Sequence, residues 1–458
     1  MRKWTRDNFS CPSKMRRLLG VMAGINYSRL GKGKLMAEHA DVIVVGGGPA
    51  GAATAHYLAQ NGVDVLVLEK ATFPRDKICG DGLTPRAVGE VIKMGISLKE
   101  EDGWVRNYGI RAYGAGHEIE VPWPELASQP NWGSASKRTD FDEILIRRAV
   151  ESGARLREGV TVTGPIVHEK SGRVVGVTAR STRDRKEEMS FSARFVVDAG
   201  GVSARLSTAV GREKAQNRPM GVAVRTYFES PLSQTDMMES WLELWAGKPN
   251  ESEQLPGYAW AFAVGDGLVN VGLGSLSSTA KPSGVDHRKV LQAWLANTPP
   301  EWNLNEQSQR GPIRGAALPM AFNRKPHYAN GLALVGDSGG MVSPFNGEGI
   351  AYALASGRLV ADFIAQALLR PTLGQQDRAM AQYPEELRLE LGGYYTLGRI
   401  FAALIERPEI MHLCVKYGLP RPTLMTLVMK LLSDAYDRRG GDWMDRLITA
   451  LTKVVPKA

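Results

Sequence analysis

The chain has 458 residues, 43% of them hydrophobic and 23% charged, which is enough for one large hydrophobic core or two fused ones. Its three cysteines, Cys11, Cys79 and Cys414, are far apart and odd in number, which argues against a disulfide framework and against a structural metal site. No apolar run is long enough to cross a bilayer, and the even charge balance beyond the N-terminus implies no nucleic-acid partner.

Most of the net charge of +9 lies at the N-terminus, because residues 1–40 hold nine Lys and Arg residues against two acidic ones. We predict that residues 1–39 form a basic extension outside the fold. It is either a disordered segment or the product of a mis-assigned start, with translation beginning at Met22 or Met36. The alternative is that its basic and apolar residues contact anionic lipid.

The first predicted elements form a βαβ unit. Residues 41–45 (DVIVV) predict a strand buried on both faces, residues 46–51 (GGGPAG) a glycine-rich turn, residues 50–60 a helix, and residues 64–69 a second strand. This is the context that a dinucleotide-binding fingerprint requires.

The turn has the spacing GxGxxG, in which glycines permit a tight turn, close approach of the backbone to a pyrophosphate, and close packing of helix on strand. Free N–H groups at the start of the helix face the phosphates. Glu69 ends the second strand, where an acid binds a ribose 2′-hydroxyl. The residues expected to contact the dinucleotide here are Gly46, Gly48, Pro49, Ala50, Gly51, Glu69 and Lys70.

The remaining pattern is interleaved. In chain order we predict strands over 107–123, a helix over 140–150 with Asp140 near its cap, a meander over 160–197, further strands over 217–276, a strand over 332–335 and mostly helices over 375–458. We therefore expect a discontinuous dinucleotide-binding domain (40–110, 140–215 and 325–372), an inserted sheet-rich substrate domain (111–139 and 216–324) and a helical C-terminal region (373–458).

A second motif identifies the dinucleotide. Residues 332–337 (LALVGD) end a strand in Gly-Asp, and residues 344–350 (PFNGEGI) precede a helix. With the GxGxxG turn, this resembles the FAD-dependent family that includes aromatic hydroxylases, halogenases and geranylgeranyl reductases. The resemblance implies an α/β, Rossmann-type FAD-binding domain in which Asp337 holds the ribityl chain. The helix start, with Gly347, Gly349 and Ile350, would then face the flavin pyrimidine ring and favour its negative charge on reduction.

Two further elements carry the same resemblance. Arg138, before the Phe-Asp pair of a predicted helix, matches an Arg that lies along FAD, and Val162 is placed beside the cofactor. In the segment 197–205 (VDAGGVSAR) the acid stands one position earlier than in the family's usual order, so the resemblance assigns no contact to Asp198.

Residues 72–87 (TFPRDKICGDGLTPRA) and 256–262 (PGYAWAF) resemble the geranylgeranyl and menaquinone reductases within this family. The resemblance implies that Cys79 and Gly80 lie by the flavin. On a strand, Tyr258, Trp260 and Phe262 project from one face and would form an aromatic wall for an apolar chain. The family's Pro after the Phe is replaced by Ala263. The alternatives are a half-buried core strand and, for Cys79, a small buried apolar side chain.

These features predict an FAD-dependent reductase that saturates double bonds in the isoprenoid chain of a prenyl lipid, with menaquinone first, by hydride transfer from reduced flavin N5. Alternatives are a geranylgeranyl diphosphate or geranylgeranyl-lipid reductase, and an FAD-dependent monooxygenase or halogenase. Tyr258 and Trp260 would stabilise positive charge on the alkene. Cys79, Tyr258 and a bound water remain open as proton donors.

Two expectations concern partners. Electrons would come from an external donor, NAD(P)H or a redox protein. The segment 398–432 alternates apolar helical stretches with basic residues and prolines, which suggests peripheral contact with the cytoplasmic side of the cell membrane; core helices in a cytoplasmic protein are the alternative.

Overall fold

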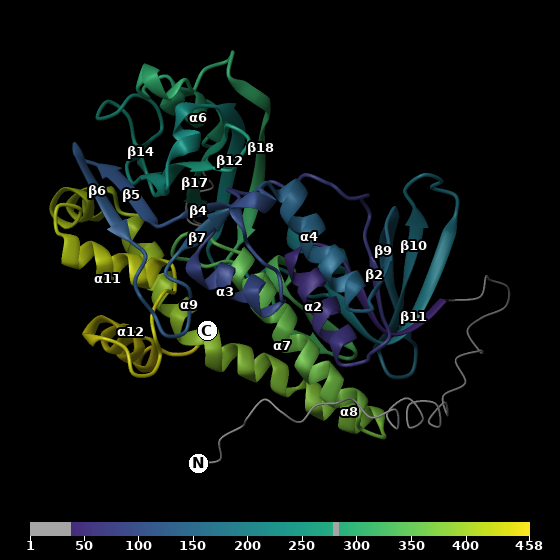
Figure 1. Cartoon of the computed structure of the whole chain (residues 1–458). Coiled ribbons are helices and arrows are strands. Elements are labelled where there is room, and N and C mark those ends of the chain that lie inside the picture. Colours follow the sequence, from purple (N-terminus) through teal and green to yellow (C-terminus); the bar gives the residue numbers. More distant parts are fainter. Residues whose placement is uncertain (1–37, 278–283) are drawn as a thin grey trace.

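The structure is a computed structural model that describes residues 38–277 and 284–458. The predicted basic extension therefore lies outside the described residues, except for Glu38 and His39, which begin the first strand. Figure 1 shows a nucleotide-binding part with the meander at one end, a second sheet above it and a group of C-terminal helices beside both.

The first sheet has eight strands, in the order β19-β20-β11-β1-β2-β8, and β10 and β9 continue antiparallel from β11. Strands β20, β11, β1, β2 and β8 run parallel, as a dinucleotide-binding sheet requires. The strand bounds are β1 (Glu38–Val45), β2 (Val65–Leu68), β8 (Arg155–Arg157), β9 (Val160–His168), β10 (Arg173–Ser181), β11 (Glu188–Asp198), β19 (Tyr328–Ala329) and β20 (Leu332–Leu334).

Helices cover one face of this sheet. Helix α2 (Pro49–Gln60) packs against α7 (Ile350–Leu368) and α4 (Arg138–Glu151), and Figure 1 shows the three side by side. The strands are apolar on both faces because the β9–β10 meander covers the opposite side; Val42, Ile43 and Val44 are fully buried. Helix α5 (Arg205–Ala209) follows β11 and contacts β9.

The second sheet has seven strands, in the order β18-β12-β17-β16-β13-β5-β6, antiparallel except for the β13–β5 pair. Helix α6 (His287–Leu295) covers one face, where the strands form a hydrophobic core. The strand bounds are β5 (Gly109–Gly114), β6 (His117–Pro122), β12 (Met220–Glu229), β13 (Met237–Trp241), β16 (Gly257–Ala263), β17 (Leu268–Ser277) and β18 (Gln309–Pro319).

Two small sheets complete the strands: β3 (Gly82–Leu83) and β4 (Val105–Asn107) flank β7 (Gly133–Ala135), and β14 (Leu244–Trp245) pairs with β15 (Gln254–Leu255). Helix α3 (Pro85–Lys93) follows β3, with the Thr84 side chain as its N-cap. Strand β7 falls within the segment 111–139 that we assigned to the substrate domain, but it pairs with strands of the loop region after β2.

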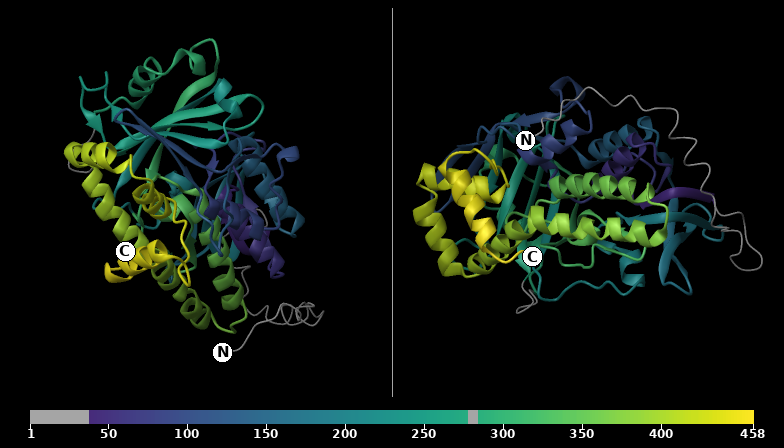
Figure 2. Two further views of the ribbon diagram at one scale, coloured as in Figure 1. Left: turned by 60° about the vertical axis from the view of Figure 1, so that its left-hand side comes forward. Right: turned by 90° about the horizontal axis from the view of Figure 1, so that it is seen from below.

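The C-terminal region is helical, as expected. It comprises α8 (Leu373–Met380), α9 (Gln382–Ile405), α10 (Pro408–Leu413), a π-helical turn over Cys414–Gly418, α11 (Pro422–Leu432) and α12 (Trp443–Val454). The views in Figure 2 show α7, α8 and α9 running beneath the nucleotide-binding part toward the group that contains α11 and α12. Within residues 38–277 and 284–458, no helix is long and apolar enough to cross a membrane.

The predicted fold class is confirmed: an α/β nucleotide-binding domain, an inserted sheet and a helical C-terminus. The predicted helix over 140–150 starts two residues earlier in the structure. Helix α4 begins at Arg138 with Lys137 at its N-cap, which makes no side-chain capping bond, and Asp140 lies in the first turn. The Asp140 carboxylate in the first turn still interacts favourably with the positive end of the helix dipole.

Candidate active site

The GxGxxG turn lies between β1 and α2, and two of its glycines have no room for a side chain. Gly46 has φ +103°, and a Cβ there would lie 2.5 Å from the Ala199 carbonyl oxygen. A Cβ on Gly51 would lie 1.8 Å from the Gly46 carbonyl oxygen. Gly46, Gly48, Pro49 and Ala50 line a cavity at the start of α2, where the free helix N–H groups face outward.

Glu69, one residue after β2, is fixed beside this turn. Its Oε2 accepts the Gly47 N–H at 2.8 Å, and its Oε1 accepts the Ala71 N–H at 2.9 Å. The carboxylate lines the cavity together with Lys70. Its remaining acceptor capacity suits a ribose hydroxyl, as the sequence predicted.

The Gly-Asp pair after β20 is far from Glu69 in the sequence but belongs to the same cavity. Asp337 lines the cavity, and Lys77 Nζ lies 3.3 Å from its Oδ2. The turn 344–349 then leads into α7, so Gly347, Gly349 and Ile350 line the cavity at the helix start. Tyr258 donates its hydroxyl to the Asn346 carbonyl oxygen at 2.8 Å, which joins this turn to the second sheet.

Arg138 is buried in the cavity wall. Its Nε and Nη2 donate to the two oxygens of Asp142 at 2.6 and 2.7 Å. Burial opposes its charge, but Asp142 and the nearby Cys79 together raise the pKa of Arg138, so it remains a cation. Arg75 donates to the same Asp142 at 2.8 Å, which places two guanidinium groups at this wall.

The Cys79 loop packs against the aromatic strand β16. Asn270 Nδ2 donates to the Cys79 carbonyl oxygen at 2.9 Å, and Asn270 Oδ1 accepts the Trp260 indole N–H at 2.9 Å. A Cβ on Gly80 would already touch the Trp260 ring at 3.4 Å, so the loop and the ring are in close contact.

Tyr258, Trp260 and Phe262 share one face of β16, with neighbouring ring centroids 5.8 and 6.2 Å apart. All three line the cavity, and they also belong to an apolar cluster with residues of β6, α11 and the π-helical turn. On this face of β16 the same three rings both pack in a hydrophobic core and line the cavity. The predicted aromatic wall and the alternative of a half-buried core strand are therefore both compatible with the structure.

One cavity of about 750 Å³ joins all these features, a size within the range of ligand and cofactor sites. Every residue predicted to contact the cofactor or substrate lines it, including Val162, except Gly51, which packs behind it. The residues fit FAD: a Cβ on Gly48 would meet only Arg75 Nη2, at 3.6 Å, which leaves space for a pyrophosphate at the glycine turn, and Glu69 and Asp337 supply acceptors for hydroxyl groups.

Sequence reasoning missed several residues of the site. Arg75 stands in the loop we compared, but its contact with Asp142 depends on the fold. Asp81 and Glu348 are carboxyls at the cavity; burial raises the pKa of Asp81 to about 6 and that of Glu348 to about 7. Their positions between glycines, in CGDGL and NGEGI, are the one signal that the sequence offered.

Asp198, to which no contact was assigned, holds the backbone instead. Its Oδ1 accepts the Gly200 N–H at 3.0 Å and its Oδ2 accepts the Ser207 hydroxyl at 2.6 Å. The shifted acid thus closes the turn after β11.

The far part of the cavity was also missed. It is lined by apolar residues of α9, α10, the π-helical turn and α11: Phe401, Ile405, Met411, Val415, Leu424 and Met425. Their spacing is that of ordinary amphipathic helices, so the sequence could not distinguish a cavity wall from a core.

Comparisons with known proteins agree with this geometry. Residues 39–369 match the family model described as FAD binding domain, which confirms FAD as the cofactor. A menaquinone reductase of Mycolicibacterium smegmatis is 34% identical over 90% of this chain and 96% of its own length. Digeranylgeranylglycerophospholipid reductase 1 of Methanopyrus kandleri is 31% identical over 72% of this chain and 81% of its own.

Among solved structures, a geranylgeranyl bacteriochlorophyll reductase-like protein from Thermoplasma acidophilum superposes with a TM-score of 0.71 and 21% identity. The match covers 91% of this chain and all of that one. At this identity the likeness shows the shared fold.

Proposed function

This chain belongs to the geranylgeranyl reductase family of FAD-dependent oxidoreductases, and from that membership we propose that it saturates double bonds in the isoprenoid chain of a prenyl lipid, with menaquinone as the first candidate. The observation that carries the proposal is the single cavity that runs from the nucleotide-binding turn, past the aromatic strand, into a passage between apolar helices.

The passage suits a hydrocarbon chain. Its walls are Leu, Met, Val and Phe side chains of α9 to α11 and the aromatic face of β16, so an isoprenoid chain would exchange water for apolar contact along its length. Tyr258 and Phe345 stand where the passage meets the cofactor end.

The charge distribution supports a substrate whose buried part is uncharged. In the described chain, the Lys and Arg side chains that line the cavity are Lys70, Arg75, Lys77, Arg138, Arg205 and Arg225. They come from the segment after β2, the first residues of α4 and α5, and β12, and the lining supplied by α9 to α11 has none. A diphosphate drawn deep into that passage would lack a counter-ion, which favours a quinone or lipid chain over geranylgeranyl diphosphate.

Reduced FAD, when bound, supplies the hydride for this reaction. The chain's own residues do the rest: Glu69, Asp337 and the turns hold the cofactor, and the apolar passage orients the chain and excludes water. The faces of Tyr258 and Trp260 stabilise positive charge that develops on a tertiary carbon, by about 0.5–2 kcal/mol for each ring.

The test is product mass. The FAD-loaded enzyme, reduced with dithionite so that no natural electron donor is needed, is incubated with menaquinone without oxygen. A gain of two mass units per double bond supports the proposal, and geranylgeranyl diphosphate as a second substrate tests the alternative. Product that gains oxygen or halogen, or that forms only with dioxygen, would assign the chain to the monooxygenases or halogenases.

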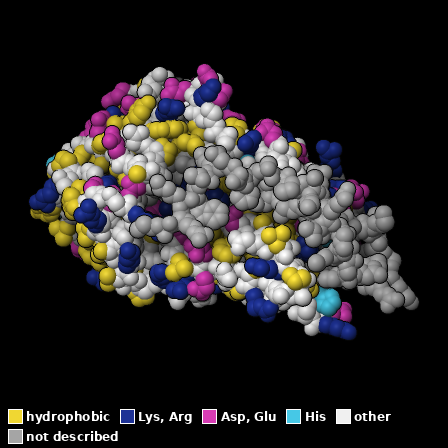
Figure 3. Space-filling model, turned by 60° about the horizontal axis from the view of Figure 1, so that its bottom comes forward, with side chains coloured by type: hydrophobic (Ala, Val, Ile, Leu, Met, Phe, Trp, Pro, Cys, Tyr) yellow, Lys and Arg dark blue, Asp and Glu magenta, His cyan; other side chains and the backbone are white. Residues whose placement is uncertain are grey.

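We also propose that the enzyme docks on a membrane through residues 413–424, which lie beside the part of the cavity lined by α9 to α11. Leu413, Tyr417 and Leu424 are 54%, 53% and 39% exposed, and Leu424 also lines the cavity. The exposed Lys416 and Arg421 lie among them. Figure 3 shows hydrophobic side chains mixed with Lys and Arg at this left-hand end of the molecule. Apolar groups ringed by cations suit an anionic lipid surface, from which a prenyl chain would enter directly.

Sedimentation with phosphatidylglycerol vesicles tests this docking. The double variant Leu413→Glu, Tyr417→Glu should lose most of its vesicle binding. The matched control is Leu369→Glu, because Leu369 is 63% exposed at the end of α7, far from the cavity. Equal binding of both variants would refute the assigned surface.

A further inference from the structure

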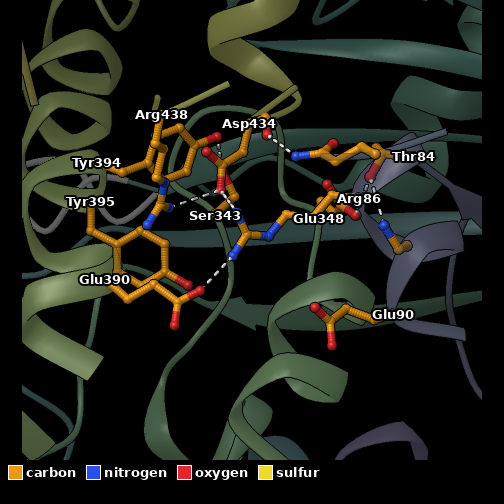
Figure 4. Close-up of polar contacts among 12 residues, drawn as sticks. Thr84, Arg86, Glu90, Ser343, Glu348, Glu390, Tyr394, Tyr395, Asp434 and Arg438 are labelled. Carbon is orange, nitrogen blue, oxygen red and sulfur yellow. Dashed lines mark hydrogen bonds and ion pairs between the residues drawn. The ribbon is translucent and has the colours of Figure 1, made fainter. Parts of the chain in front are cut away.

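Glu348 is a carboxyl in the cavity to which no role has yet been given. It stands between Gly347 and Gly349 in the turn before α7 and lines the cavity. Its Oε1 accepts the Thr84 hydroxyl at 2.7 Å, while Oε2 is buried and has no hydrogen-bond partner in the described chain. Figure 4 shows Glu348 beside Thr84 and Arg86, and the Arg86 guanidinium reaches on to Asp434 and Glu390.

No positively charged side chain forms an ion pair with the Glu348 carboxylate in the described chain. The nearby guanidinium of Arg86 is already paired with Asp434 at 2.5 Å and with Glu390 at 3.1 Å. Within the described residues no Lys, Arg or His lies within ion-pair distance of Glu348. Burial raises the pKa of Glu348 to about 7, and the Thr84 hydrogen bond and the charge of Arg86 oppose this only in part. A large fraction of the molecules therefore carry the proton at neutral pH.

The carboxyl lies at the junction of the two halves of the cavity. Asn346, two residues before it, accepts the hydroxyl of Tyr258, and Tyr258 is the first ring of the aromatic wall. The turn that carries Glu348 also carries Gly347 and Gly349 at the predicted flavin end. Glu348 and the aromatic wall thus line one cavity, beside the turn at the predicted flavin end.

The other candidate acids are less suitable. Burial raises the pKa of Tyr258, and its hydroxyl proton is already donated to Asn346. Asp81 is 1% exposed, and its Oδ2 accepts both Tyr227 and Asn270, so it braces the Cys79 loop.

We propose that Glu348 is the catalytic acid that protonates the isoprenoid double bond. This inference rests on the proposed function. The O–H bond of the carboxyl breaks and a C–H bond forms at one alkene carbon with the π electrons. The other carbon takes a hydride from the reduced cofactor, so the alkene gains two electrons and the cofactor loses two. Glu348 remains as a carboxylate that the Thr84 hydroxyl and Arg86 stabilise, and it regains its proton from solvent.

The groups that face Glu348 predict a simple pH dependence. They are Thr84 and Arg86 from α3 and the turn before it, Asp434 after α11, Glu390, Tyr394 and Tyr395 from α9, Tyr352 from α7 and Tyr258 from β16. Burial raises the pKa of all four tyrosines, which stay neutral phenols, and Arg86 keeps its two carboxylate partners. The reductive step should therefore slow as pH rises through about 7, where Glu348 loses its proton.

The test compares Glu348→Gln with the wild type as FAD-loaded full-length enzymes. Gln has the same shape but no acidic proton, so we expect alkene reduction to fall by about 10²–10⁴-fold. FAD affinity, dithionite reduction of the flavin and the affinity for menaquinone should be unchanged, and Glu348→Asp should recover part of the rate. The control is Glu90→Gln, because Glu90 is also a buried carboxyl but is paired with Arg358 and Lys93 away from the cavity. It should keep the wild-type rate.

A readout independent of turnover is the carboxyl C=O band in infrared pH-difference spectra. A band that titrates near pH 7 in the wild type and is lost in Glu348→Gln supports the proposal. A wild-type rate in Glu348→Gln, or an unchanged band, overturns the role of Glu348 while prenyl reduction itself stands. A wild-type enzyme that reduces no prenyl chain overturns the proposed function and this inference with it.

Discussion

Helix α2 is held between two backbone contacts, which makes Gly51→Ala a sharp test of the nucleotide-binding turn. A Cβ on Gly51 would lie 1.8 Å from the Gly46 carbonyl oxygen, whereas ordinary contacts begin near 3.4 Å. The helix would have to move by roughly 1.5 Å to restore normal contact. It cannot move freely toward α7, because Gly357 on that helix lies so close that its Cβ would be 2.6 Å from the Ala50 carbonyl oxygen.

We therefore expect Gly51→Ala to lower the free energy of unfolding of the apoprotein by about 1–3 kcal/mol or more, the usual effect of overpacking. FAD binding should fall as well, because the displaced helix start carries the N–H groups that face the phosphates. Urea unfolding of the apoprotein measures the first effect, and fluorescence titration with FAD measures the second.

Gly48→Ala separates the two effects. Within the described chain a Cβ on Gly48 would meet Arg75 Nη2 at 3.6 Å and otherwise open space, and its backbone is extended, so the apoprotein should unfold like the wild type. The methyl group would nevertheless project where the pyrophosphate is expected, and FAD affinity should drop at least tenfold, about 1.4 kcal/mol. Gly374→Ala, with no atom within 4 Å, is the control and should change neither quantity adversely. Wild-type stability in Gly51→Ala would refute the reasoning.

Three other substitutions test separate parts of the structure. Glu69→Gln should weaken FAD binding roughly tenfold in apoprotein titrations, because an amide N–H replaces one of two acceptor oxygens; unchanged affinity would contradict the assignment. Trp260→Phe should lower the free energy of unfolding by about 1–3 kcal/mol by leaving Asn270 Oδ1 without its donor, and an unaltered urea midpoint would argue against that bond. Burial lowers the pKa of His327 to about 4, so the unfolded chain takes up a proton below 6.5 that the folded protein refuses, and stability should fall by about 3 kcal/mol as pH drops from 6.5 to 4. His327→Gln should flatten this part of the stability curve, and an identical slope would assign the pH dependence to other groups.

The nucleotide-binding half could be predicted because its chemistry is local. The strand, the GxGxxG turn, the helix and Glu69 follow one another within about thirty residues, and within this unit Gly51 is required by Gly46 and Glu69 accepts the Gly47 N–H. The clash at Gly46 comes from the distant Ala199, but the motif itself is local. The aromatic strand could be predicted for the same reason, since alternate residues share a face whatever the fold.

The rest of the site depends on contacts between distant segments. Asp142 on α4 receives Arg75 from the loop after β2, 67 residues away, and Thr84 meets Glu348 across 264 residues of chain. No pattern in the sequence specifies such a pair. Asp198 stands one position earlier than the acid of the family motif, and the sequence assigned it no contact. In the structure its carboxylate accepts hydrogen bonds that close the turn after β11.

The depth of the apolar passage has a consequence for regiochemistry. Leu424 is 39% exposed and lines the same cavity as Met425, Phe401, Tyr258 and the turn that carries Glu348, so a chain that enters beside Leu424 would reach that turn through the apolar lining. The distance from the entrance to that junction would then act as a ruler, so that the position of a double bond along the chain, more than the identity of the head group, decides whether it is reduced. Chains too short to span the passage would be held without reaction, and longer chains would be reduced only at the double bond that lies at this distance.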